Sequence, residues 1–115
     1  MSIFTDLFGR PVPTIQAGQL HDRLKDGRQL FILDVRQPEE FRMGHISGAT
    51  LIPLGELGRR LGEVPKDREV VCICATGHRS VPAVRQLMAA GYSASSMKNG
   101  MLAWQMARFP VQRGG

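Results

Sequence analysis

The chain has 115 residues, 43% of them hydrophobic and 22% charged, which is the composition of one ordinary globular domain. A chain of this length buries roughly two-thirds of its unfolded surface, so its core requires neither disulfides nor a metal ion. Its two cysteines, Cys72 and Cys74, are too few and too close together for a disulfide framework, and they favour a reducing compartment.

No stretch approaches the roughly 18 consecutive apolar residues of a membrane span, so we expect no contact with a membrane. The first residues, Met1 to Asp6, have no basic segment before an apolar run and do not resemble a secretory signal. We therefore expect a cytoplasmic protein.

The net charge of +5 raises the question of nucleic-acid binding, and the distribution of the charge argues against it. All ten acidic residues lie between Asp6 and Glu69, where ten Lys and Arg residues balance them. The excess comes from five scattered cations in residues 70–115, in a chain with one Trp and one Tyr for base stacking. We expect no nucleic-acid partner and instead a small anionic substrate near the C-terminal part.

Hydrophobic periodicity predicts alternating strands and helices, without an internal repeat or a linker. In the first half it predicts a short strand at Ile15, a helix over 17–25, a buried strand over 29–35, a short helix from Pro38 and a short strand over 50–52. Leu54, Leu57 and Leu61 then have the spacing of one helix face.

The second half begins with a buried strand over 69–74 and a loop over 75–78. A helix over 80–90 follows, with four side chains predicted to face inward: Val81, Val84, Leu87 and Met88. Residues 93–97 are a weak, polar strand candidate, and residues 101–107 form the last predicted helix. This order predicts an α/β fold, in which a mostly parallel sheet of about five strands is flanked by helices on both faces.

Cys74 comes at the end of a buried strand, before a short loop that contains glycine and leads into a helix. Backbone N–H groups of residues 75–79 can converge on its sulfur and form an anion-binding nest. A free thiol has a pKa of about 8.5, and a helix N-terminus with a nearby Arg lowers it, which favours a nucleophilic thiolate. A buried apolar cysteine is the alternative interpretation, and the local residues leave both open.

Four segments carry a resemblance to a known family: Asp34-Val35-Arg36 with Glu40-Phe41, residues 44–49 with Ile52-Pro53, residues 74–80, and residues 99–104 with Pro110. In order and spacing they resemble the rhodanese-like sulfurtransferases over residues 13–112, nearly the whole chain. The resemblance implies a rhodanese-like fold and a single rhodanese domain over residues 1–115.

The resemblance also implies a double-displacement reaction with Cys74 as the catalytic residue. Cys74 would take a sulfur from a small anionic donor, thiosulfate or a persulfide, and pass it to cyanide or a thiol. The substrate-binding residues would be those of the loop, Ala75, Thr76, Gly77, His78 and Arg79, whose amides stabilise the persulfide anion. We expect neither a cofactor nor a metal ion. The alternative is a sulfur-relay or regulatory binding module that acts only with a protein partner.

Three positions refine this expectation. Arg79 lies five positions after Cys74, whereas related phosphatases have an Arg six positions after their cysteine, and the shorter loop favours a single sulfur over a phosphate. Many members that use thiosulfate have a cation directly after the cysteine, so Ala75 and Thr76 predict a poor use of thiosulfate. Asn99 replaces the first glycine of a Gly-Gly pair, and Asn can still adopt a positive φ.

Several neighbouring residues have a structural interpretation beside a functional one. Arg79 would bind either an anionic donor or an acid beneath the loop, such as Asp34. Asp34 and Arg36 are interpreted as structural residues, and Arg36 and Glu40 are close enough in sequence to pair across the short helix. The resemblance implies that His45 fixes a turn rather than taking part in catalysis.

The other candidates near the site are His78, Cys72 and Trp104. Histidine is the side-chain type that serves most often as a base, but His78 is expected to face solvent rather than act as one. Cys72 is interpreted as a buried thiol rather than a partner for Cys74, and Trp104 as a packing residue rather than a wall of the site.

Overall fold

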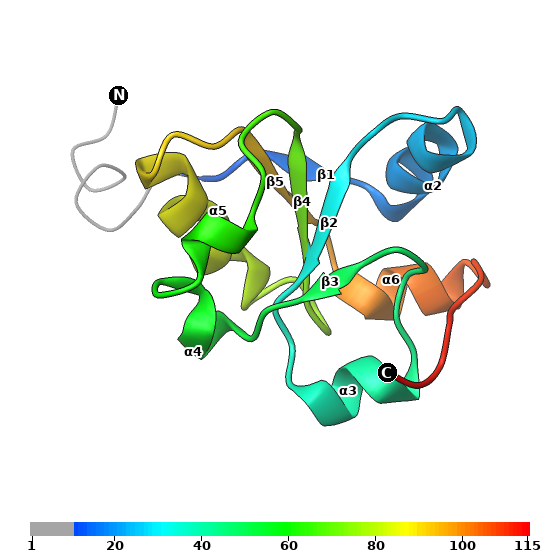
Figure 1. Cartoon of the computed structure of the whole chain (residues 1–115). Helices are drawn as coiled ribbons and strands as arrows, with labels where there is room; N and C mark the ends of the chain where they lie inside the picture. Colours follow the sequence, from blue (N-terminus) through cyan, green and yellow to red (C-terminus); the bar gives the residue numbers. More distant parts are fainter. Residues whose placement is uncertain (1–10) are drawn as a thin grey trace.

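The computed structural model describes residues 11–115, and the segment Met1 to Asp6, on which the expectation about a signal rests, lies outside them. Within these described residues, five strands and five helices alternate, with one 3₁₀ turn (Figure 1). The strands are β1 (Thr14–Ile15), β2 (Phe31–Asp34), β3 (Thr50–Leu51), β4 (Val70–Ile73) and β5 (Ala94–Met97). The helices are α2 (Ala17–Lys25), α3 (Pro38–Met43), α4 (Leu54–Leu57), α5 (Ser80–Ala89) and α6 (Gly100–Met106), and the 3₁₀ turn spans Leu61–Glu63.

The strands form one parallel sheet in the order β1-β5-β4-β2-β3. This confirms the predicted α/β class and the five-stranded parallel sheet. β4 lies at the centre of the sheet, where Cys72 pairs with Leu33 on one side and with Ser96 on the other. Because parallel strands end at the same edge, the segments that follow β2, β4 and β5 meet there.

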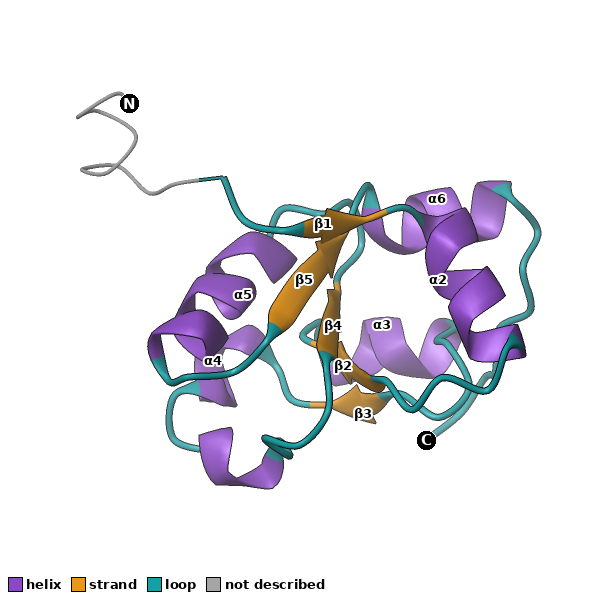
Figure 2. Ribbon diagram, turned by 90° about the horizontal axis from the view of Figure 1, so that it is seen from above, coloured by secondary structure: helices purple, strands orange, loops and turns teal. Residues whose placement is uncertain are grey.

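Helices cover both faces of the sheet, with α4 and α5 on one side and α2 and α6 on the other (Figure 2). Leu33, Cys72 and Leu87 belong to the core between the sheet and α5, and Leu20 and Trp104 belong to the core on the opposite face. β4 contributes to both cores, since its successive side chains point to alternate faces and all four are buried.

Two details of the predicted helices were wrong. The stripe of Leu54, Leu57 and Leu61 does not form one helix, because α4 ends at Leu57 and Leu61 begins the 3₁₀ turn. Gly58 and Gly62 lie in this stretch, and glycine disfavours a continuous helix because it loses the most backbone entropy. Met88 is 47% exposed, because the buried side of α5 consists of Ser80, Ala83, Val84 and Leu87.

The weak strand candidate over 93–97 was right, although its strand signal was poor. β5 lies between β1 and β4, and its four residues are buried. Its two serines, Ser95 and Ser96, are therefore buried polar residues.

Candidate active site

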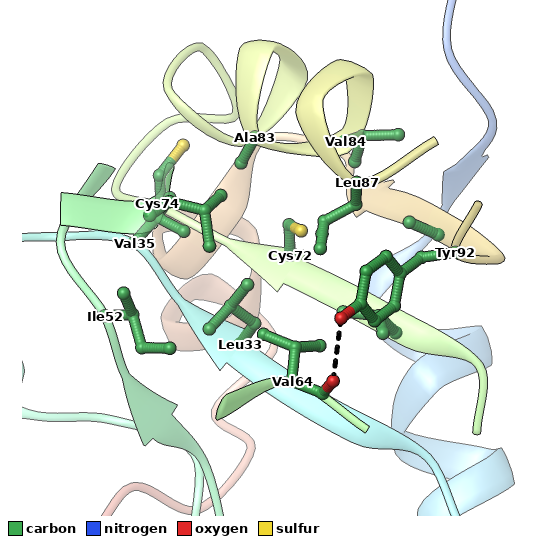
Figure 3. Packing of buried hydrophobic residues seen from close by; sticks show 13 residues of the cluster. Leu33, Val35, Ile52, Val64, Cys72, Cys74, Ala83, Val84, Leu87 and Tyr92 are labelled. Carbon is green, nitrogen blue, oxygen red and sulfur yellow. Dashed lines mark hydrogen bonds between the residues drawn. The ribbon is translucent and has the colours of Figure 1, made fainter. Parts of the chain in front are cut away.

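Cys74 lies directly after the central strand, at the carboxyl edge of the sheet. Residues 75–79 form the loop that follows it, and α5 begins at Ser80. The Cys74 side chain projects toward the beginning of α5, on the sheet face that this helix covers (Figure 3). A ten-residue helix therefore presents its N-terminus, with the partial positive charge of its free amides, to the sulfur.

Three hydrogen-bonding contacts surround the Cys74 sulfur. The amide of Gly77 donates to Sγ at 3.0 Å and the amide of Ser80 donates at 3.3 Å, while the Ser80 hydroxyl lies 3.4 Å away. Gly77 belongs to the loop residues that sequence analysis selected, and Ser80 does not. Ser80 could have been found from its place as the first residue of α5, where backbone amides lack partners within the helix.

The loop is held in its curled shape by Asn99 and the first residues of α6. Gly77 has a φ of +95°, and a Cβ at this position would lie 2.9 Å from the Asn99 nitrogen. The amide of Met101 donates to the Cys74 carbonyl at 2.8 Å, and the amide of Leu102 donates to the Ala75 carbonyl at 3.0 Å. These bonds fix the directions of the two loop carbonyls. Asn99 has the expected positive φ, at +61°.

Arg79, the last residue of the loop, forms an ion pair with α3. Its two terminal nitrogens donate to both carboxylate oxygens of Glu40, each at 2.7 Å. This contact lowers the pKa of Glu40 to about 2. The acid beneath the loop is therefore Glu40 rather than Asp34. The side chains of Arg79 and Glu40 are each about one-third exposed.

The predicted pair between Arg36 and Glu40 is wrong. Arg36 instead binds the carboxylate of Asp34, with Nη2 2.8 Å from Oδ2, and also donates to the Gly44 carbonyl at 2.8 Å. Asp34 and Arg36 are two residues apart in extended chain, so their side chains leave the backbone on the same side. Both are buried, and their pairing satisfies two charges that would be costly alone.

The two histidines near the site have different surroundings. His78 is exposed, with its Nδ1 2.9 Å from Thr76 Oγ1. His45 is buried, stacks on Phe41 and places Nδ1 2.7 Å from the Phe41 carbonyl, so it holds the turn after α3, as predicted.

Two further side chains considered in the sequence lie within the cores. Cys72 is buried beneath α5 (Figure 3), and burial, followed by the charge of Cys74, raises its pKa to about 12. Trp104 packs edge-on against His21 and Phe109 and donates from Nε1 to the Pro110 carbonyl at 2.9 Å. Both have the packing environment that we predicted.

Cys74 is 0% exposed, and a hollow of about 310 Å³ lies beside its loop. Thr76, Gly77 and His78 line the hollow from the loop, and Ser96, Lys98 and Asn99 line it from β5 and the segment after it. A larger pocket of about 440 Å³ lies elsewhere, between α2, Trp104 and residues 110–112. The hollow beside the loop offers one cation and several hydroxyl and amide groups, which suits an anion.

Within residues 11–115, no helix is long and apolar enough to cross a bilayer. In the same part of the chain, no group of three His, Cys, Asp or Glu side chains is arranged to hold a metal ion. The chemistry that the site offers is that of a cysteine sulfur held among amide donors at a helix N-terminus.

Comparisons with known proteins find relatives that are similar to this chain over most of its length. The chain is 35% identical over 101 residues to a sulfurtransferase of Allochromatium vinosum, covering 87% of this chain and 94% of the relative. It is also 37% identical over 111 residues to an HTH-type transcriptional regulator of Mycobacterium tuberculosis, covering 95% of this chain. It spans about half the length of that regulator, 49%.

A solved structure with the same fold is the rhodanese-related protein of Thermoplasma volcanium. It superposes with a TM-score of 0.83 at 30% identity, covering 89% of this chain and 99% of the other. A model of the rhodanese-like domain family matches residues 16–107, which include every segment of the site. The chain therefore belongs to the rhodanese-like domain family.

Proposed function

We propose that this protein is a sulfurtransferase in which Cys74 carries the transferred sulfur as a persulfide. The observation that carries the proposal is the pair of amides, from Gly77 and Ser80, that donate to Cys74 Sγ at 3.0 and 3.3 Å. Donors fixed before the reaction stabilise an anion without reorganisation, and the persulfide is an anion. The sulfurtransferase relative, which this chain covers almost completely, supports the same activity at the level of the family.

The reaction has two half-reactions around one sulfur. The Cys74 thiolate attacks the outer sulfur of the donor, an S–S bond forms, and the donor's own bond to that sulfur breaks. The leaving group, sulfite when the donor is thiosulfate, takes the bonding electrons. In the second half-reaction, cyanide or a thiolate attacks the outer sulfur of the persulfide, and the Cys74 thiolate leaves.

The loop supports a persulfide or a protein-bound donor better than thiosulfate. Ala75 and Thr76 supply no cation beside the sulfur, and Arg79 is engaged by Glu40. Lys98 is the lysine that lines the neighbouring hollow, and it is the candidate for binding a small anion there. We therefore expect thiosulfate to load Cys74 more slowly than a low-molecular-weight persulfide does.

Intact mass after incubation with each donor tests the proposal. Wild-type protein is expected to gain the mass of one sulfur and to lose it again when cyanide is added. Cys74→Ser should gain none, whereas Cys72→Ser should load normally because the Cys72 thiol has a pKa of about 12 and remains protonated. Loading that persists in Cys74→Ser would refute the role of Cys74.

A second candidate function is a module that exchanges sulfur, or senses it, only with a protein partner. Cys74 has no exposed surface, which favours a donor that opens the loop on binding. One relative of this chain is a transcriptional regulator, and the matching region covers 49% of the length of that regulator. A wild-type protein that takes sulfur from neither small donor, with Cys74 reduced, would favour this function over the first.

A further inference from the structure

The Cys74 sulfur is linked to a second buried hydroxyl through Ser80. Ser80 Oγ lies 3.4 Å from Cys74 Sγ and 2.6 Å from Ser96 Oγ. Ser80 belongs to α5 and Ser96 to β5, so two separate elements supply the two hydroxyls. The serines are 0% and 1% exposed, and Ser96 belongs to the lining of the hollow beside the loop.

The directions of these hydrogen bonds depend on the charge of the sulfur, because each hydroxyl donates a single proton. If the sulfur is a thiol, Cys74 donates to Ser80 and Ser80 donates to Ser96. The Ser96 proton then has no acceptor within the chain of three groups. If the sulfur is an anion, Ser96 donates to Ser80 and Ser80 donates to the sulfur, so both hydroxyl protons are bound.

A hydrogen bond to a charged acceptor is stronger than one to a neutral acceptor. The three groups together therefore favour the anionic sulfur over the thiol. Because Ser96 donates to the Ser80 oxygen, it polarises the Ser80 hydroxyl and strengthens its bond to the anion.

We propose that Ser96 is a positioning residue for sulfur transfer, which turns the Ser80 proton toward the anionic sulfur of Cys74. The inference rests on the proposed function, in which that sulfur alternates between a thiolate and a persulfide anion. Ser96 does not contact the sulfur and acts through Ser80.

The same chain gives the thiol proton a route out of the core. The Cys74 S–H bond breaks and leaves its electron pair on sulfur, while the proton passes to Ser80 and the Ser80 proton passes to Ser96. Ser96 releases its own proton to water in the hollow. The hydroxyls then rotate to donate toward the sulfur.

Charged and titratable groups around the sulfur are the same with or without Ser96. Cys72 of β4 and Arg79 before α5 interact with it electrostatically. His78 and Lys98 line the hollow into which Ser96 faces. A substitution that removes only the Ser96 hydroxyl leaves all four in place, so its effect on the sulfur reports the hydroxyl chain.

Alkylation of Cys74 by iodoacetamide across pH, located by peptide mass, tests the inference without a sulfur donor. Ser96→Ala is expected to slow alkylation about tenfold near neutral pH, since one bond supporting a charged group is lost. Its rate profile should also move upward by about one pH unit. Ser96→Thr keeps a hydroxyl and should restore the wild-type profile.

Ser95→Ala is the matched control, because Ser95 precedes Ser96 on β5 and points to the other face. Its Oγ is buried and makes no hydrogen bond within residues 11–115, so the profile of this variant should equal that of wild type. If Ser96→Ala does not fold, Ser80→Ala interrupts the same chain one step earlier and should give the same upward movement.

An unchanged pH profile in a folded Ser96→Ala would overturn the inference, even if sulfur loading fell, because a purely structural role lowers the rate equally at every pH. Sulfur uptake from a persulfide is measured in parallel. If wild type takes up no sulfur while the alkylation profile still moves in Ser96→Ala, the proposed function fails and the hydroxyl chain stands as a property of the thiol.

Discussion

Cys72 and Cys74 are two residues apart, face the same side of the sheet and are both fully buried, yet their surroundings differ. Burial among apolar side chains raises the pKa of Cys72 to about 12, so this thiol stays protonated at neutral pH. Cys74 lies one residue beyond the strand, where Gly77 and Ser80 direct amides at its sulfur. The difference arises from where β4 ends, since only the residue that follows the strand reaches the loop and the start of α5.

Gly100, the first residue of α6, is the residue whose replacement should most directly distort the loop. A Cβ at Gly100 would lie 2.3 Å from the Cys74 carbonyl oxygen, at a φ of +56°. Gly100→Ala should therefore cost about 1–2 kcal/mol for the left-handed conformation and about 1–3 kcal/mol more for the overlap. Urea unfolding should give the loss of stability, and sulfur loading of Cys74 should fall with it.

Gly48→Ala is the control for this substitution, because Gly48 also has a positive φ, +85°, but no atom lies within 4 Å of its added Cβ. It should show the conformational cost of about 1–2 kcal/mol alone and normal sulfur loading. Equal losses in the two variants would show that the contact with the Cys74 carbonyl has no energetic role.

At the scale of elements, α3 is joined to the end of the loop that follows Cys74 through the ion pair of Glu40 and Arg79. The pKa of Glu40 falls from 4.5 to about 2, chiefly because Arg79 donates to its carboxylate. The pair therefore contributes its full stability above pH 4.5 and loses it as the pH falls toward 2. Between pH 4.5 and 2, the melting temperature of Glu40→Gln should therefore fall less steeply than that of wild type.

The size of this effect is limited, because both side chains are about one-third exposed. Solvent screening restricts the contribution to about 1 kcal/mol at most. Glu39→Gln removes the same charge from an exposed neighbour on α3 and should keep the wild-type slope. If Glu40→Gln and wild type lost stability in parallel between pH 4.5 and 2, the ion pair would not contribute to stability.

The elements could be predicted from sequence because their signals are local. The helix over 17–25 has the predicted bounds, and the buried strands β2 and β4 lie within the predicted runs. β5 had a weak signal because its two serines satisfy no hydrophobic pattern, and their burial depends on the neighbouring strands. The Leu61 segment was misjudged because side-chain spacing alone does not report the helix end near Gly58.

The candidate site could be predicted in part for the same reason. The loop from Cys74 to Arg79 is continuous in sequence, so its position after a buried strand was visible. The contacts from Ser96, Glu40 and Gly100 come from segments that only the folded sheet brings to Cys74 and its loop. No local pattern distinguishes Glu40 from Asp34 as the partner of Arg79, because that choice depends on where α3 packs.

At the scale of the whole molecule, the sheet separates the sulfur from the larger pocket. Cys74 belongs to the core beneath α5, whereas His21 and Trp104, which line the 440 Å³ pocket, lie on the face covered by α2 and α6. The chain between β2 and β3 is one of the connections between the two sides at the carboxyl edge. Arg36 there binds Asp34 and the Gly44 carbonyl, and His45 pairs with Gln112 of the C-terminal segment.

The Asp34 and Arg36 pair should therefore be a main determinant of the stability of the molecule. Arg36 is only 4% exposed. Asp34→Asn removes the negative charge that balances Arg36 and leaves a buried cation without a counterion. Breaking such a pair costs about 3–5 kcal/mol, which urea unfolding should detect as a lower midpoint with an unchanged slope.

Glu56→Gln is the matched control, because Glu56 pairs with Arg60 at 2.8 Å at the surface, where 38% of the Glu56 side chain is exposed. It should cost about 1 kcal/mol or less. Equal losses in the two variants would mean that the buried pair acts as a surface pair does, and that other contacts hold the carboxyl edge of β2 against the segment that carries Gly44.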